Sequence, residues 1–161
     1  MPITGQIVLN GDGFLEIASG VITGHEVLRF LDDLLESPTM PNPYFVFLDY
    51  SKVEAVKASI HEVREVAMKG RLLMPRSRRT SVFAVIASKP IVFGLARMWQ
   101  MFVEFPTGWH IRVFYQRDEA LAWLQSEVHL RHQYTLPPPA EWLPPEPTSS
   151  LPQSPGAPHL P

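Results

Sequence analysis

Residues 44–50 read YFVFLDY and residues 81–87 read SVFAVIA, and these two apolar runs decide the fold. Each run is apolar at successive positions, which predicts a strand that is covered on both faces of a sheet. Helical patterns lie between and after the two runs. Because strands and helices alternate, the sequence predicts an α/β domain with right-handed crossovers and a largely parallel sheet.

Turn and capping signals place the neighbouring elements. The NGDG run at 10–13 tolerates positive φ, so it predicts an N-terminal hairpin between flanking apolar runs. Thr23 and Ser59 each precede a glutamate by three residues, the capping box that begins a helix. A helix is predicted at 90–105, and a strand at 111–115 precedes the last helix. The expected fold is a mixed, mostly parallel sheet of about five strands with an N-terminal hairpin and about four helices.

The composition excludes several functional classes. The 161 residues include no cysteine, so disulfides, thiolate metal sites and cysteine nucleophiles are excluded. No apolar run reaches the ~20 residues of a membrane span and the N-terminus lacks a signal-peptide pattern, so we expect a cytoplasmic protein. Residues 1–134 carry 14 basic and 14 acidic side chains. This balance disfavours a specific role in nucleic-acid binding, which needs a basic excess.

The composition changes at residue 134. Ten of the 17 prolines lie in residues 135–161, and proline forms neither a helix interior nor a central strand. We therefore predict a folded domain over 1–134 and a proline-rich, extended or disordered tail over 135–161. Trp142 and Leu143 are the apolar exception in this tail. They either dock onto an apolar groove or belong to a solvated segment.

Helix 90–105 is apolar around most of its circumference. Its polar side chains Arg97, Gln100 and Glu104 form one thin stripe. A surface helix needs an apolar arc of only about 100°. The excess must contact a second subunit, an apolar ligand or the tail, unless the sheet and neighbouring helices bury it. We predict a homodimer through this helix, with an interaction surface formed by Phe93, Met98, Trp99, Met101, Phe102 and Phe105.

Three motifs carry a resemblance to a known family: FVFLDYSKV at 45–53, FGLARM at 93–98 and VFYQRDEALAWL at 113–124. They resemble the STAS family, the SpoIIAA-like fold of anti-sigma-factor antagonists, which is related in fold to CRAL-TRIO lipid-binding domains. The resemblance implies a non-enzymatic regulatory or ligand-binding module. In the antagonists a serine that begins the helix after the second core strand is phosphorylated. Ser59 matches that serine only as a helix-initiating residue, because the family's Asp-Ser-Ser-Gly run is absent here; a plain N-cap is the alternative.

Three further groups of residues are candidate sites. A basic cluster could hold an anion or an acidic partner, or form a solvated face; it comprises Lys69, Arg71, Arg76, Arg78 and Arg79. His129 and His132 have a ligand-like spacing, but no third ligand is placed beside them, so no metal or cofactor is predicted. Asp49 ends a central strand, where ligands bind in open α/β sheets; hydrogen bonds to turn amides are the alternative.

Two functions therefore remain open. The first is a regulatory protein–protein interaction module that dimerises through helix 90–105 and contacts an unknown protein partner. The second is a carrier of an apolar or lipid-like molecule in a CRAL-TRIO-like pocket. A flat patch behind the helix favours the module, whereas an enclosed apolar cavity favours the carrier. An enzyme is disfavoured because no nucleophile–base pair or phosphate-binding loop is traced.

Overall fold

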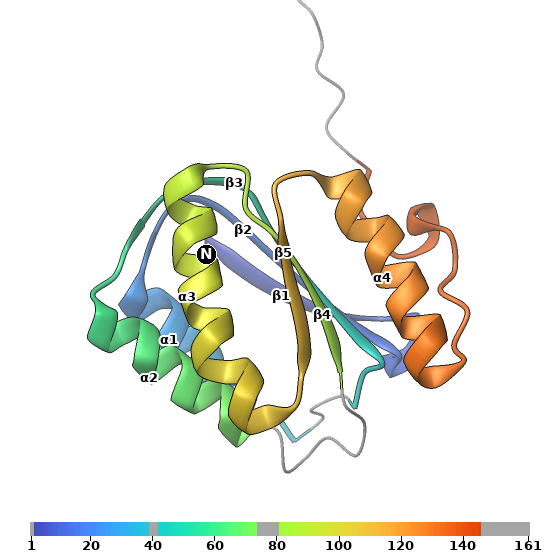
Figure 1. The fold of residues 1–161 in the computed structure, drawn as a ribbon. Helices are drawn as coiled ribbons and strands as arrows, with labels where there is room; N and C mark the ends of the chain where they lie inside the picture. The colour runs from blue at the N-terminus through green and yellow to red at the C-terminus, as the bar shows by residue number, and fades with distance from the viewer. Residues whose placement is uncertain (1, 39–41, 74–80, 146–161) are drawn as a thin grey trace, which may run out of the picture.

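The computed structural model describes residues 2–38, 42–73 and 81–145, which form three layers (Figure 1). A five-stranded sheet is the middle layer. Helices α1 (Gly24–Glu36), α2 (Ile60–Leu72) and α3 (Pro90–Thr107) cover one face, and α4 (Arg117–His132) covers the other. The alternation of strands and helices predicted from the sequence is confirmed.

The five strands lie side by side in chain order. They are β1 (Ile3–Val8), β2 (Gly13–Thr23), β3 (Phe45–Lys57), β4 (Val82–Ile86) and β5 (His110–Phe114). β1 and β2 are antiparallel, and every other neighbouring pair is parallel. The predicted hairpin is thus confirmed. Its turn holds Leu9, Asn10 and Gly11 at positive φ, a conformation that costs least for glycine and asparagine.

Strand β3 is longer than the sequence predicted. The apolar run at 44–50 predicted a strand that ends near Tyr50, whereas β3 continues to Lys57. Its second half pairs with the second half of β2, from Ser19 opposite Lys52 to Thr23 opposite Lys57, with two register shifts in the pairing. Backbone pairing with the long strand β2 stabilises this extension of β3, whose residues do not form a continuous apolar run.

The helix ends follow local signals. Thr23 and Ser59 each complete a capping box: the hydroxyl accepts a backbone N–H from the glutamate three residues on, and the carboxylate accepts the N–H of the cap. Pro90 is the first residue of α3, where its missing N–H is not needed. Gly108 ends α3 with φ 68°, the left-handed conformation typical of a helix C-terminus.

Both faces of the sheet are buried, which gives the domain two apolar cores. Side chains alternate between the two faces along each strand, so a strand covered on both sides is apolar at successive positions. The core beneath α1, α2 and α3 includes Phe14, Val46, Leu48, Phe83 and Val85. The core beneath α4 includes Leu15, Phe45, Phe47, Ala84, Ile86 and Leu124.

Residues after α4 pack into the second core. Trp142 is 6% exposed, and its indole meets the rings of Phe45 and Phe47 edge-on, at centroid distances of 5.0 and 5.6 Å. Its Nε1–H donates to the carbonyl of Pro137 at 3.1 Å. Leu143 is buried beside it. Residues 135–145 therefore form part of the packed fold, while residues 146–161 of the predicted tail lie outside the described residues.

Helix α3 lies along β5, the edge strand of the sheet (Figure 1). Two residues of its polar stripe, Gln100 and Glu104, face this strand, whereas Arg97 is exposed. Gln100 Nε2 donates to the carbonyl of Ile111 at 2.7 Å, and the N–H of Ile111 donates to Glu104 Oε1 at 3.5 Å. An edge strand has backbone groups without a neighbouring strand to bind them. Gln100 and Glu104 therefore protect the sheet edge, and the apolar side chains of α3 face the core or solvent.

We expect Gln100→Ala to lower the free energy of unfolding by about 1–3 kcal/mol, because it leaves the Ile111 carbonyl without its partner. Urea denaturation measures the change. Gln125→Ala removes the same atoms from an exposed position on α4 and should change stability by less than about 0.5 kcal/mol. Equal losses in the two variants would show that Gln100 does not protect the edge.

Candidate functional site

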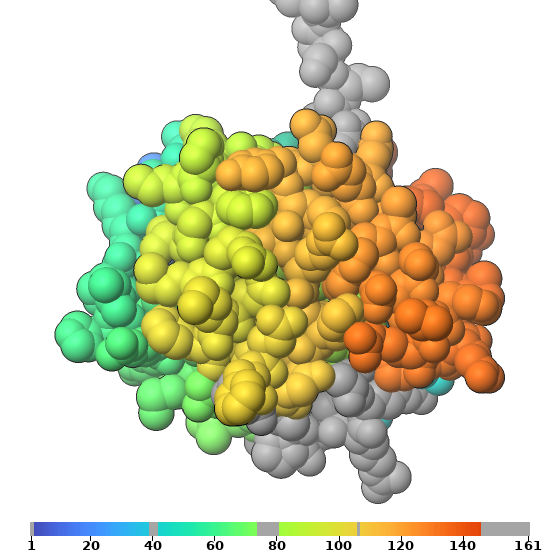
Figure 2. Space-filling model, in the orientation of Figure 1, coloured from blue at the N-terminus to red at the C-terminus, as the bar shows by residue number. Residues whose placement is uncertain are grey.

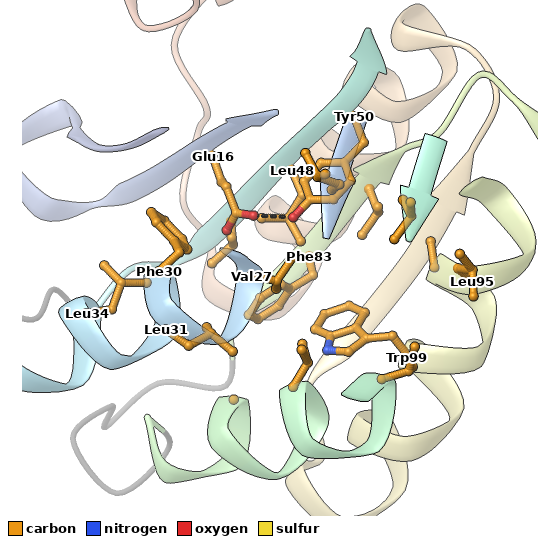
Figure 3. A pocket seen from close by; sticks show the side chains of 18 of the residues that line it. Glu16, Val27, Phe30, Leu31, Leu34, Leu48, Tyr50, Phe83, Leu95 and Trp99 are labelled. Atoms are coloured by element: carbon orange, nitrogen blue, oxygen red, sulfur yellow. Dashed lines mark hydrogen bonds between the residues drawn. The ribbon is translucent and has the colours of Figure 1, made fainter. Parts of the chain in front are cut away.

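A cavity of about 190 Å³ lies between the sheet and helices α1, α2 and α3 (Figure 3). Strands β2, β3 and β4 line one side of it. Helix α1 contributes Val27, Phe30, Leu31 and Leu34, and α3 contributes Leu95, Ala96 and Trp99. The volume exceeds the ~150 Å³ of a buried apolar cavity that accepts benzene. The cavity therefore has room for a small organic molecule.

One polar pair interrupts this apolar lining. Glu16, on β2, is only 7% exposed. Tyr50, on the neighbouring strand β3, donates its hydroxyl proton to Glu16 Oε1 (Figure 3). The second carboxyl oxygen, Oε2, has no hydrogen-bond partner among the residues that the structure describes. One oxygen of the pair is thus left to interact with an occupant of the cavity.

The environment of Glu16 favours its neutral form. Burial raises the pKa of the Glu16 carboxyl from 4.5 to about 7, although the hydrogen bond from Tyr50 lowers it in part. Burial, together with the Glu16 carboxyl, raises the pKa of Tyr50 well above 10, so the tyrosine stays protonated. No lysine, arginine or histidine is among the described residues that line the cavity. Glu16 is therefore partly protonated near neutral pH, and no described residue of the lining supplies a cation.

Glu16 is not among the site residues predicted from the sequence. A signal was nevertheless present. Glu16 shares a strand face with Phe14 and Ala18, and a glutamate on a face that is otherwise apolar requires a partner or a function. Its partner Tyr50 lies 34 residues further along the chain. Only the pairing of β2 with β3 brings the two side chains together, so the pair could not be predicted from residues close together in the sequence.

The structure divides the predicted α3 surface into two parts. Phe105 and Met101 are 96% and 73% exposed, and Met98 is partly buried on the same side of the helix. Phe93, Trp99 and Phe102 pack against the core of their own subunit. Trp99 also lines the cavity, and the ring of Phe93 stacks on Tyr115 at a centroid distance of 4.0 Å. An interaction surface on α3 is therefore restricted to its outer residues.

Ser59 is exposed at the N-terminus of α2. Its backbone N–H donates to Glu62 Oε2 at 2.7 Å, and its Oγ accepts the backbone N–H of Glu62 at 3.2 Å. These hydrogen bonds lower the pKa of the Glu62 carboxyl. The hydroxyl therefore serves as a helix cap, and phosphorylation of Ser59 stays a prediction.

Two members of the predicted basic cluster make contacts between helices. Lys69 Nζ lies 2.5 Å from Asp32 Oδ1, which links α2 to α1. Arg71 Nη2 donates to the carbonyl of Phe102, which links α2 to α3. Arg76, Arg78 and Arg79 lie outside the described residues. An anion-binding or partner-binding patch in this region stays a prediction.

Asp49 is buried at the end of the apolar part of β3. Its Oδ1 accepts hydrogen bonds from the backbone N–H and the hydroxyl of Ser51, at 3.0 and 2.6 Å. Its Oδ2 lies 3.3 Å from Arg117 Nη1 at the start of α4. Arg117 Nη2 in turn donates to the carbonyl of Pro144 at 3.4 Å. These contacts connect the sheet, α4 and the segment after it. The Ser51 amide belongs to strand β3 and not to a turn, and ligand binding at Asp49 stays a prediction.

Neither a metal centre nor a membrane helix is found in the described parts of the chain. Across residues 2–38, 42–73 and 81–145, His, Asp and Glu form no group of three or more suited to a metal ion. Glu127 Oε2 lies 3.0 Å from His110 Nε2 and 3.2 Å from Arg131 Nε. Within the same ranges no helix has both the length and the hydropathy that crossing a membrane requires.

The chain is similar in fold to proteins of known structure. No protein-family model and no curated protein matches the chain. A solved structure of a DUF3478-family protein with a SpoIIAA-like fold, from Shewanella loihica, is 20% identical, with a TM-score of 0.48 over 76% of this chain and 91% of that chain. The anti-sigma factor antagonist SpoIIAA in its unphosphorylated form is 10% identical, with a TM-score of 0.50 over 77% of this chain and 96% of that chain. The chain therefore has a SpoIIAA-like α/β fold, as the sequence resemblance implied.

Proposed function

We propose that this protein is a non-enzymatic binding module that holds a small apolar molecule between the sheet and helices α1, α2 and α3. The observation that carries the proposal is the apolar cavity of about 190 Å³. Protein interiors are close-packed, and empty space costs about 24 cal/mol per Å³ of stability. A bound molecule would gain van der Waals contacts with the apolar side chains that line this space.

The lining supports binding and not catalysis. Glu16 and Tyr50 are the titratable side chains among the described residues that line the cavity. Ser81 also lines it, and its hydroxyl donates to the carbonyl of Pro43 at 2.9 Å. The Tyr50 hydroxyl lies beside the Glu16 carboxyl, but burial raises the pKa of Tyr50 well above 10, so this hydroxyl stays protonated and is a poor nucleophile. The size of the cavity favours a compact molecule of roughly eight to ten non-hydrogen atoms over a long lipid chain.

Filling the cavity tests the proposed function. Ala96 lines it from α3, so we expect Ala96→Phe to abolish binding of ethylbenzene, a compact apolar probe. The wild type should bind this probe with chemical-shift changes confined to residues around the cavity. Met101→Phe adds a ring at an exposed position on the same helix and should leave binding unchanged. Absence of ethylbenzene binding to the folded wild type would refute the proposal.

A second candidate function is a regulatory module that dimerises through α3. The specific observation is the exposure of Ile91, Met101 and Phe105, which are 70%, 73% and 96% exposed. Their spacing places them along one side of the helix. Figure 2 shows that α3 forms a large part of the face seen there, beside α4. SpoIIAA, which is similar in fold, is an anti-sigma factor antagonist, so a role in protein contact is consistent with this architecture.

If α3 forms a dimer interface, the double variant Met101→Glu/Phe105→Glu should be monomeric where the wild type is dimeric. Buried carboxylates without partners at an apolar interface strongly oppose association. Light scattering after size-exclusion chromatography measures the mass. Leu130→Glu places the same charge at an exposed leucine on α4 and should leave the dimer intact. A monomeric wild type at ~100 µM contradicts this candidate.

A further inference from the structure

The position of Glu16 restricts the chemistry of a molecule that the cavity can bind, provided that the proposed function holds. Tyr50 has one hydroxyl proton and donates it to Glu16 Oε1. Glu16 Oε2 has no partner among the described residues, and its side chain is nine-tenths buried. Glu16 lines the cavity, so a ligand that supplies a partner for this oxygen gains affinity as well as orientation.

The charge around the cavity decides which ligand group is complementary. The described lining residues of β3, β4 and the three helices carry no positive charge. A ligand carboxylate beside the Glu16 carboxyl would therefore find no counter-ion among these described residues, which is strongly unfavourable in an apolar environment. A ligand ammonium would require burial of an ion pair, whose desolvation offsets its attraction. A neutral oxygen acceptor avoids both costs, because a protonated carboxyl donates one hydrogen bond to it.

We propose that the cavity selects a neutral molecule whose carbonyl or hydroxyl oxygen accepts a hydrogen bond from Glu16 Oε2, and that it rejects carboxylates of the same size. Tyr50 positions the carboxyl by holding Oε1, and the aromatic rings of Phe30, Phe83 and Trp99 contact the apolar body of the ligand. The raised pKa of Glu16, about 7, supports the donor state near and below neutral pH.

Four probes of nearly equal size test this selectivity: ethylbenzene, acetophenone, phenylacetate and phenethylamine. Their dissociation constants are measured for the full chain by NMR titration at pH 6. Acetophenone should bind about three- to tenfold more tightly than ethylbenzene, the gain from one hydrogen bond. Phenylacetate and phenethylamine should each bind at least about tenfold more weakly than acetophenone.

Two variants assign the selectivity to Glu16. Glu16→Leu should bind ethylbenzene and acetophenone equally, because the donor is lost. Glu16→Gln retains an N–H donor next to an oxygen that accepts from Tyr50, so it should keep the preference for acetophenone. At pH 9 the wild type should lose that preference while Glu16→Gln keeps it, a comparison that does not depend on whether the leucine variant folds.

The outcomes separate this inference from the proposed function. If ethylbenzene binds but acetophenone is no tighter, or if phenylacetate or phenethylamine binds most tightly, the selectivity inference is overturned while the cavity remains a binding site. If none of the four probes binds the folded wild type, the proposed function fails and the inference fails with it.

Discussion

Trp142→Ala is expected to destabilise the protein by about 3–5 kcal/mol, the range for removing a large buried aromatic side chain. Trp142 is almost fully buried and contacts the rings of Phe45 and Phe47 on the central strand β3. Alanine would leave a cavity over these rings and would remove the hydrogen bond from the indole to Pro137. The free energy of unfolding, measured by urea denaturation, gives the size of the loss.

The control for this prediction is Leu130→Ala. Leu130 is an apolar residue on α4 that is 74% exposed, so its truncation should change stability by less than about 0.5 kcal/mol. If Trp142→Ala costs less than about 1 kcal/mol, residues 135–145 would be a loosely held tail. The comparison thereby decides between the two interpretations of Trp142 and Leu143 that the sequence left open.

Glu16→Gln is expected to stabilise the protein at pH 8 by about 3 kcal/mol relative to the wild type, and to have little effect at pH 4. The pKa of the Glu16 carboxyl is about 7 in the folded state and 4.5 as a model value. Between these values the folded state binds a proton that the unfolded state has released. The stability of the wild type that is due to Glu16 is therefore complete below pH 4.5 and falls as the pH rises through 7.

The difference in unfolding free energy between the two proteins isolates this effect from other titrating groups. Glutamine keeps an oxygen that accepts the Tyr50 hydrogen bond, so the variant removes the ionisation and retains the packing. Glu119→Gln, at an exposed position in α4, is the matched control. Its difference from the wild type in unfolding free energy should stay constant between pH 4 and pH 8. A constant difference between pH 4 and pH 8 for Glu16→Gln would show that Glu16 is not held in a desolvating site.

Local signals in the sequence were enough to predict most of the fold. The continuous apolar runs at 44–50 and 81–87 indicated strands buried on both faces, and β3 and β4 form the centre of the sheet. Thr23 and Ser59 marked helix starts through hydrogen bonds that span three residues. These capping signals can be identified in the sequence because the two residues that form the hydrogen bonds are only three positions apart. The extension of β3 to Lys57 depends on β2, which is distant in sequence, and was not predicted.

Helix α3 has more apolar side chains than a single buried face requires, but the sequence does not show what these side chains contact. The sequence identified Arg97, Gln100 and Glu104 as one thin polar stripe, and it identified the rest of the helix as unusually apolar. The structure places Gln100 and Glu104 on the edge strand β5, where they bind the backbone of Ile111. The apolar circumference is therefore divided between the core, the cavity and solvent. Only the position of the helix relative to the sheet edge decides that division.

The amino-acid sequence by itself determined the alternation of elements, the hairpin, the capped helix starts and the absence of cysteine chemistry, because these depend on residues that are close together in the chain or on composition alone. Only the tertiary structure decided that Trp142 completes the core beneath α4 and that Glu16 and Tyr50 meet in an apolar cavity. Burial and strand pairing of this kind bring together residues that are far apart in the chain. The apolar surroundings that result raise the pKa of the Glu16 carboxyl.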